Sequence, residues 1–262
     1  MKLKVLFMSS NPSLDYEYDQ ETGEIVGLES VSVLQLDEEY RSIEQAIARN
    51  SDKGAVELKI KTAPRMTDLI EALNQEKPDI LHFSGHGMEK SGELCLVKDI
   101  DTTPTAIPTE ALSTLFETVE DNLKVVFLDS CYSKVQAEAI ITHVDYVIAM
   151  NDAIGDDSAT TLATMFYSAF ASGKSLQNAF KQAKIMLMAN HPDEKNIPEL
   201  LMRTEDVKDF SLADFLQTPQ DNGEARGDEK PAGKSEGGGT TINIGRDVNG
   251  QIITGGHNTV SK

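Results

Sequence analysis

The chain has 262 residues, of which 39% are hydrophobic, enough for one full-sized domain with a core and a further segment. Its 24 basic and 43 acidic residues give a formal net charge of −19, which repels a phosphate backbone, so we expect no nucleic-acid partner. Cysteine occurs only at Cys95 and Cys131, which excludes a disulfide framework and indicates a reducing compartment.

No segment predicts export or a membrane span. The apolar start, Met1–Met8, is too short for a signal peptide, and polar residues follow at once. No run approaches the ~20 apolar residues that a membrane helix needs. We therefore expect a cytoplasmic protein without a membrane partner.

Strands and helices are predicted to alternate along residues 1–216. The first strand, 4–8, is followed by a polar, acidic stretch, 13–32, that predicts a surface loop or insertion. The next predicted elements are a helix from Leu36, a strand at 56–60, a helix at 67–73, a strand at 80–83, a short hairpin strand at 93–97 and a helix from Pro108. They are followed by a strand at 124–128, a helix at 134–141, a strand at 146–150 and helices at 156–171 and 175–189. This alternation predicts an α/β domain, with a mostly parallel central sheet covered by helices on both faces.

Two predicted strands end in residues that can do chemistry. Leu81–Gly87 (LHFSGHG) ends with His86 between glycines, and Val125–Cys131 (VVFLDSC) ends with Cys131. Reacting groups in a parallel sheet lie beyond the carboxyl ends of the strands, so this thiol and this imidazole are expected in one crevice. A thiol with an adjacent base is the minimum apparatus for nucleophilic attack on a carbonyl.

The residue after the histidine extends this prediction. Gly87 lets the backbone approach a substrate closely, and its N–H together with that of Cys131 would form an oxyanion hole. His86 would act as general base and acid near neutral pH. Taken singly, a cysteine at a strand end is more often a small buried hydrophobe. The occurrence of both groups at matching strand ends favours the catalytic interpretation.

We expect neither a metal nor a cofactor. His82 and His86 are four residues apart, but on a strand that leads into a turn they need not converge. The sequence places no carboxylate or third ligand beside them. The glycines lack the spacing of a phosphate-binding loop.

Several blocks of sequence together resemble one family. These blocks are Phe7–Pro12 (FMSSNP), Leu36–Arg41 (LDEEYR), His82–Gly87 (HFSGHG), Leu128–Ser133 (LDSCYS), Val147–Asn151 (VIAMN) and Phe166–Tyr167. Over about residues 1–215 the chain resembles the CHAT family, bacterial caspase-like peptidases often fused to TPR repeats. The resemblance implies a caspase-like three-layer sandwich, a His86/Cys131 dyad and hydrolysis of peptide bonds. The dyad's spacing of 45 residues is close to the roughly 50 residues of caspase-type enzymes. This chain lacks TPR repeats, so the activation of such relatives does not transfer to it.

Two aspartates are candidates for substrate binding. In the similar metacaspases, the aspartate two residues before the cysteine lines the pocket for a basic side chain, and here that residue is Asp129. The following Tyr132-Ser133 departs from the His-Ser-Gly of those relatives, and Asp129 can equally hold a backbone turn. Asp156 is a further pocket candidate, although the sequence favours it more as a helix cap.

The composition changes after the predicted domain, 1–216. Residues 217–239 are rich in glycine and charge and predict a flexible linker. Residues 240–262 alternate apolar and polar side chains between glycines, a pattern that can stack in register. This segment is similar to RHIM-like bacterial amyloid signalling motifs, which implies a sensor or receptor with a matching β motif, or a homo-oligomer or fibre. The alternatives are an edge strand on the domain and a disordered tail.

Two functional hypotheses follow. The first is a cysteine endopeptidase of CHAT type, acting on a protein or peptide substrate as a bacterial defence or cell-death effector that its C-terminal motif recruits. The second is a catalytically silent caspase-like adaptor that scaffolds a signalling assembly.

Overall fold

The computed structural model describes residues 2–12, 14–18, 25–30, 34–62, 65–88, 91–98, 104–119 and 122–217. Contacts along the chain separate one unit, Met1–Pro219, from a second, Gln220–Lys262. The predicted linker beyond Gln217 and the predicted β motif at 240–262 lie outside the described residues.

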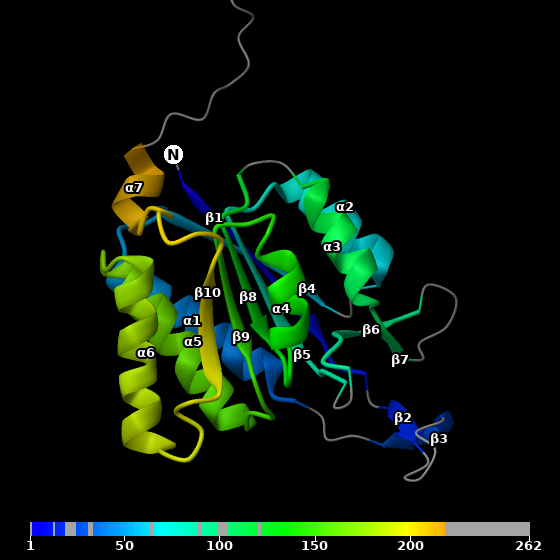
Figure 1. The fold of residues 1–262 in the computed structure, drawn as a ribbon. Coiled ribbons are helices and arrows are strands. Elements are labelled where there is room, and N and C mark those ends of the chain that lie inside the picture. The colour runs from blue at the N-terminus through cyan, green and yellow to red at the C-terminus, as the bar shows by residue number, and fades with distance from the viewer. Residues whose placement is uncertain are drawn as a thin grey trace, which may run out of the picture. The chain divides into compact units, whose positions relative to one another are not determined.

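Six strands form the central sheet, in the spatial order β10-β9-β8-β5-β1-β4 (Figure 1). Their bounds are β1 Leu3–Ser10, β4 Val56–Thr62, β5 Ile80–Gly85, β8 Val125–Asp129, β9 Tyr146–Met150 and β10 Pro198–Met202. Neighbours in this sheet are parallel except β10, which runs antiparallel to β9. The strand order reverses at β1, and a ligand crevice is expected beyond the carboxyl ends at such a point.

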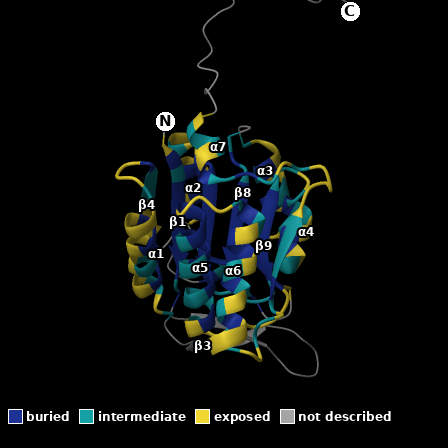
Figure 2. Ribbon diagram, turned by 90° about the vertical axis from the view of Figure 1, so that its left-hand side faces the viewer, coloured by how far each residue is buried: buried dark blue, intermediate teal, exposed yellow. Residues whose placement is uncertain are grey.

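Helices cover both faces of the sheet. One face packs against α1 (Leu36–Asn50), α5 (Asp156–Ala171), α6 (Leu176–Asn190) and α7 (Leu212–Gln217). The other face packs against α2 (Met66–Glu76), α3 (Thr109–Glu117) and α4 (Lys134–Ile140). Figures 1 and 2 show these layers, with buried strands between helices whose outer surfaces are exposed. The predicted three-layer α/β architecture is confirmed.

The alternation of side chains along each strand explains why the strands read as continuous apolar runs. In β1, Val5 and Phe7 enter the core beneath α1 and α5, whereas Leu6 and Met8 enter the opposite core. A parallel strand covered on both faces must be apolar at every position. His82 in β5 is an exception to that rule, because it is polar and fully buried. A buried polar side chain of this kind indicates a role in the fold or in the site.

The structure adds elements that the sequence analysis did not anticipate. A hairpin of β2 (Leu14–Tyr18) and β3 (Ile25–Ser30) occupies much of 13–32, where a loop was expected. Its alternating LDYEY segment carried a strand period that the acidic composition obscured. The hairpin strand predicted at 93–97 is present as β6 (Cys95–Val97), and its partner β7 (Pro104–Ala106) was not predicted. Among the described residues, no helix is long and apolar enough to cross a membrane.

Candidate active site

Sheet register brings the two segments that carry the predicted dyad to the same edge of the sheet. Strands β5 and β8 are adjacent and parallel, with Ser84 opposite Asp129. His86 and Cys131 each follow two residues later on their own strand. The carboxyl ends of both strands therefore deliver these residues to one edge of the sheet.

Gly87 packs directly against the cysteine backbone. A Cβ added to Gly87 would lie 2.1 Å from the Cys131 carbonyl oxygen and 2.7 Å from Ser130 Oγ. Real Cβ atoms essentially never approach backbone this closely, so a residue without a Cβ is required here. The His-Gly and Ser-Cys segments are thus locked together by a backbone contact that only glycine permits.

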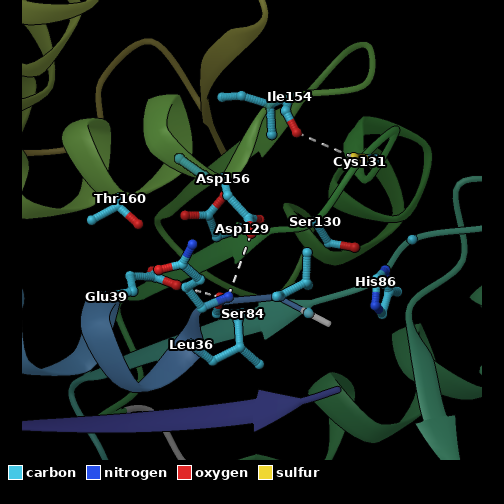
Figure 3. Close-up of a pocket in the computed structure, with 15 residues that line it drawn as sticks. Leu36, Glu39, Ser84, His86, Asp129, Ser130, Cys131, Ile154, Asp156 and Thr160 are labelled. Carbon is cyan, nitrogen blue, oxygen red and sulfur yellow. Dashed lines mark hydrogen bonds between the residues drawn. The ribbon is translucent and has the colours of Figure 1, made fainter. Parts of the chain in front are cut away.

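All five residues predicted for the site line one pocket. Its volume is about 480 Å³, and it is open to solvent. The five residues are His86, Gly87, Asp129, Cys131 and Asp156. Figure 3 shows the carboxylates gathered at one end of this pocket and the thiol and imidazole toward the other. The structure therefore brings the predicted residues together, while their chemical roles stay a prediction.

The thiol is half-buried and points to a carbonyl of a neighbouring loop. Cys131 Sγ donates to the Ile154 carbonyl oxygen at 3.7 Å (Figure 3). Burial raises the pKa of the Cys131 thiol above its usual value, and the negative charge of Asp129 adds to this. The arrangement holds a protonated thiol, which needs a base before it can act as a nucleophile.

Two backbone donors face the same region. The Cys131 N–H is hydrogen-bonded to the thiol of the same residue. Among the residues that the structure describes, the Gly87 N–H donates to no backbone carbonyl. The turn that follows is sharp: Tyr132 has a φ of 58°, and its N–H donates to the Asp152 carbonyl at 3.3 Å. N–H groups beside a thiol on a braced turn are suited to hold a developing oxyanion.

A carboxylate that the sequence analysis left without a role lies at the floor of the pocket. Glu39, from α1, is only 3% exposed. Its Oε2 accepts from Ser84 Oγ at 2.5 Å, and its Oε1 lies 3.0 Å from His82 Nε2. A hydrogen bond also links Glu39 to Asp129, which is 4% exposed. Helical spacing was the available signal, because Glu39 is four residues before buried Ile43 and shares its face.

His82 is an uncharged, buried side chain next to Glu39. Its ring stacks between Phe7 (centroids 4.8 Å apart) and Phe127 (4.5 Å), and its Nδ1 lies 3.3 Å from the Tyr167 hydroxyl. Burial lowers the pKa of His82 to about 4. An uncharged ring donates from one nitrogen and accepts at the other, so it can hydrogen-bond to Tyr167 and Glu39 at the same time.

The absence of carboxylates around His82, expected from sequence, was wrong. Ligand atoms of Glu39, His82 and Asp129 all lie within 4.8 Å of one another, and all three residues are buried. Helix α1 and strand β8 supply the two acids from far along the chain, which local spacing cannot reveal. The direct hydrogen bonds among these groups already account for most of their polar atoms, so we do not assign a metal here.

Asp156 is placed differently from the helix cap that the sequence favoured. The N-cap of α5 is Gly155, whose N–H donates to Glu194 at 3.1 Å, and Asp156 is the first helical residue. Its Oδ2 accepts from the Gln35 N–H at 3.4 Å, and the residue lines the pocket. Asp156 thus keeps its candidacy for the pocket and loses the capping role.

The fold is a three-layer α/β sandwich with a mostly parallel sheet. A thiol and an imidazole lie beyond the carboxyl ends of two of its strands. The CHAT domain family model matches residues 7–223, and the chain belongs to this family. The chain is also similar to a curated relative from Gillisia limnaea described as a "Probable protease", 24% identical over 163 residues. That match covers 61% of this chain but only 28% of the relative's length.

Solved structures of cysteine peptidases are also similar to this chain. The structure of gingipain R, described as an Arg-specific cysteine proteinase, matches with a TM-score of 0.48 and 12% identity, over 80% of this chain and 46% of that one. Caspase-1 from Spodoptera frugiperda matches with a TM-score of 0.45 and 8% identity, over 77% of this chain and 86% of that one.

Proposed function

We propose that the chain is a cysteine endopeptidase that cleaves peptide bonds with Cys131 and His86. The observation that carries this proposal is the backbone contact of Gly87 with Cys131, which holds the segments that carry the imidazole and the thiol together at one pocket. Membership of the CHAT family supports it.

The proposed reaction uses groups already in place. His86 takes the proton from Cys131 Sγ as the sulfur bonds to the substrate carbonyl carbon, and the N–H groups of Gly87 and Cys131 hold the oxyanion. The C–N bond then breaks, and His86 returns the proton to the leaving amine. Water hydrolyses the thioester, which releases the carboxylic acid and restores the thiol. Before attack, the thiol must leave the carbonyl of Ile154, its partner at rest.

A basic side chain fits the pocket best. Its lining includes the three acidic residues Glu39, Asp129 and Asp156, and within the described ranges it includes no lysine or arginine. Buried carboxyl groups are stable when a cation pairs with them, so we propose cleavage after Lys or Arg. Asp129 and Glu39 would contact the positive charge at the floor of the pocket.

The test is cleavage of a series of fluorogenic peptides by the full-length chain. Cys131→Ala should abolish turnover of Arg and Lys peptides, and His86→Ala should reduce it to near background, because each removes one half of the dyad. Cys95→Ala is the matched control, since Cys95 is fully buried and lies outside the pocket lining. Unchanged turnover in Cys131→Ala would remove the dyad from consideration.

One observation favours a second function, that of a silent adaptor. The thiol rests on a carbonyl, with its pKa raised, rather than as a thiolate. A thiol-reactive peptide probe separates the two functions. In a peptidase, Cys131 reacts much faster with His86 present than in His86→Ala, whereas an adaptor shows equal rates.

The C-terminal segment would serve recruitment. We propose that residues 240–262 pair with a matching β motif on a sensor protein, and that the resulting clusters activate the domain in a bacterial defence or cell-death response. Their alternating sequence behind a glycine-rich linker supports this role. A synthetic 240–262 peptide should form dye-binding fibres, and an Ile244→Pro peptide should not. A wild-type peptide that stays soluble and unordered at high concentration would contradict the proposal.

A further inference from the structure

The strongest unassigned feature is the contact between two buried carboxyl groups. Glu39 and Asp129 come from α1 and β8, share a hydrogen bond and face the pocket together. Both oxygens of Glu39 already have partners, in His82 and Ser84. Among the described residues, Oδ2 of Asp129 has none, although the residue is only 4% exposed. This oxygen is therefore open to a donor that the described residues do not supply, such as water or the N–H groups of a bound cation.

The groups around this pair do not supply a positive charge. From β5 it faces the neutral imidazole of His82 and the hydroxyl of Ser84. From α5 it faces Asp156 and the phenol of Tyr167, and the thiol of Cys131 and the imidazole of His86 line the same pocket. Among the residues that the structure describes, no lysine or arginine lines this pocket. Within that part of the chain, the pair therefore has no fixed counter-ion.

We infer that Glu39 and Asp129 form a proton-sharing pair that senses the charge of the substrate, and that a cationic side chain displaces a proton from this pair when it binds. This inference rests on the proposed peptidase function and deepens it. It makes Glu39, which is hydrogen-bonded to His82 and Ser84 at the floor of the pocket, a determinant of substrate specificity.

The physical basis is the cost of placing two negative charges in contact away from water. Burial raises the pKa of Glu39 to about 7. Burial, followed by the charge of Glu39, raises the pKa of Asp129 well above its usual value. The empty pair thus keeps at least one proton at neutral pH, held on Asp129 and donated to Glu39. A guanidinium or ammonium group supplies both positive charge and N–H donors, so it stabilises the ionised pair and releases the proton.

The direction of the resulting pH dependence is fixed. Below pH 7 the pair is largely protonated, and a cationic side chain must expel protons to bind. Linkage then tightens binding by up to about tenfold per pH unit as the pH rises toward 7. A neutral side chain of the same shape gains nothing from ionisation of the pair. A citrulline peptide, isosteric with arginine, should therefore bind with little change over this range.

The experiment is calorimetric titration of the full-length Cys131→Ala chain with matched Arg and citrulline peptides, in buffers of different ionisation enthalpy. At pH 6.5 we expect release of about one proton for the Arg peptide and close to none for citrulline. Glu39→Gln should reduce both the proton release and the preference for arginine. Glu38→Gln removes the same charge from the exposed neighbouring position and is the matched control. His86 is retained in both variants, so the two differ only in which carboxylate is removed.

Each outcome decides the inference. Arg binding without proton release, or with the release seen for citrulline, overturns it, even if Glu39→Gln fails to fold. Proton release that EDTA abolishes would assign the pair to a divalent cation and also overturn it. Cleavage is scored separately with intact Cys131. Cys131-dependent cleavage without proton release leaves the peptidase proposal standing and removes this inference. Proton release without such cleavage supports the charge-sensing pair and removes the peptidase.

Discussion

Gly87→Ala tests whether the contact between the two strand ends positions the nucleophile. The new Cβ would lie 2.1 Å from the Cys131 carbonyl oxygen, about 1.3 Å short of the 3.4 Å at which ordinary van der Waals contacts begin. The atom in the way belongs to the backbone, so no side-chain rotation relieves the clash. The segments carrying His86 and Cys131 must therefore separate by roughly that distance.

The expected effect on activity exceeds the effect on stability. Overpacking of this kind costs about 1–3 kcal/mol in the free energy of unfolding. A displacement of about 1 Å between reacting groups costs on the order of 100-fold in rate, so we expect kcat/KM for an Arg peptide to fall by about that factor. The assays are steady-state cleavage and urea denaturation of the same preparations.

Gly54→Ala separates the two effects. Gly54 has a φ of 86° and open space around it, in the turn before β4 at the opposite edge of the sheet. An alanine there costs about 1–2 kcal/mol through its left-handed backbone, with no change expected in kcat/KM. If Gly87→Ala cleaves at the wild-type rate, the contact does not position the nucleophile, and the reasoning built on it fails.

Three further predictions concern the floor of the pocket and the thiol. The pKa of Glu39 is raised to about 7 in the folded chain, so the wild type should lose stability relative to Glu39→Gln as the pH rises from about 4.5 to about 7. Urea denaturation of both proteins across that range measures this loss, and parallel curves would contradict the prediction. His82→Ala removes the ring stacked between Phe7 and Phe127 and should lower the free energy of unfolding by about 3 kcal/mol, whereas a loss below about 1 kcal/mol would show that the stack is not part of the core. Alkylation of Cys131 by iodoacetamide should keep accelerating with pH beyond the range of a free thiol, since its pKa is raised; a plateau near neutral pH would reveal a thiolate instead.

Much of the fold was predictable because the spacing of apolar residues along each segment indicates a helix or a strand. The β8 and β9 runs are apolar at nearly every position, so their burial on both faces of a parallel sheet followed from sequence. The hairpin of β2 and β3 and the antiparallel edge strand β10 were missed. Short or polar strands owe their pairing to neighbours in space more than to their own composition.

The candidate site likewise contains residues that the sequence could identify and residues that it could not. Residue type and position at a strand end were enough to select His86, Gly87 and Cys131, and the register of the sheet then placed them at one pocket. Glu39 could not be selected with them, because its role depends on where α1 docks against β5 and β8. The same limit applies to Ile154, which lies in a loop after β9 and whose carbonyl oxygen accepts the hydrogen bond from the Cys131 thiol.

Sequence alone therefore determined which chemical groups the chain possesses and at which strand ends they emerge, since side-chain identity and hydrophobic period are local properties. Tertiary structure alone decided the electrostatic state of those groups. Burial and charge contact among Glu39, His82 and Asp129 arise from three elements that the fold brings together, and the energy of a charge depends on everything within a few ångströms of it.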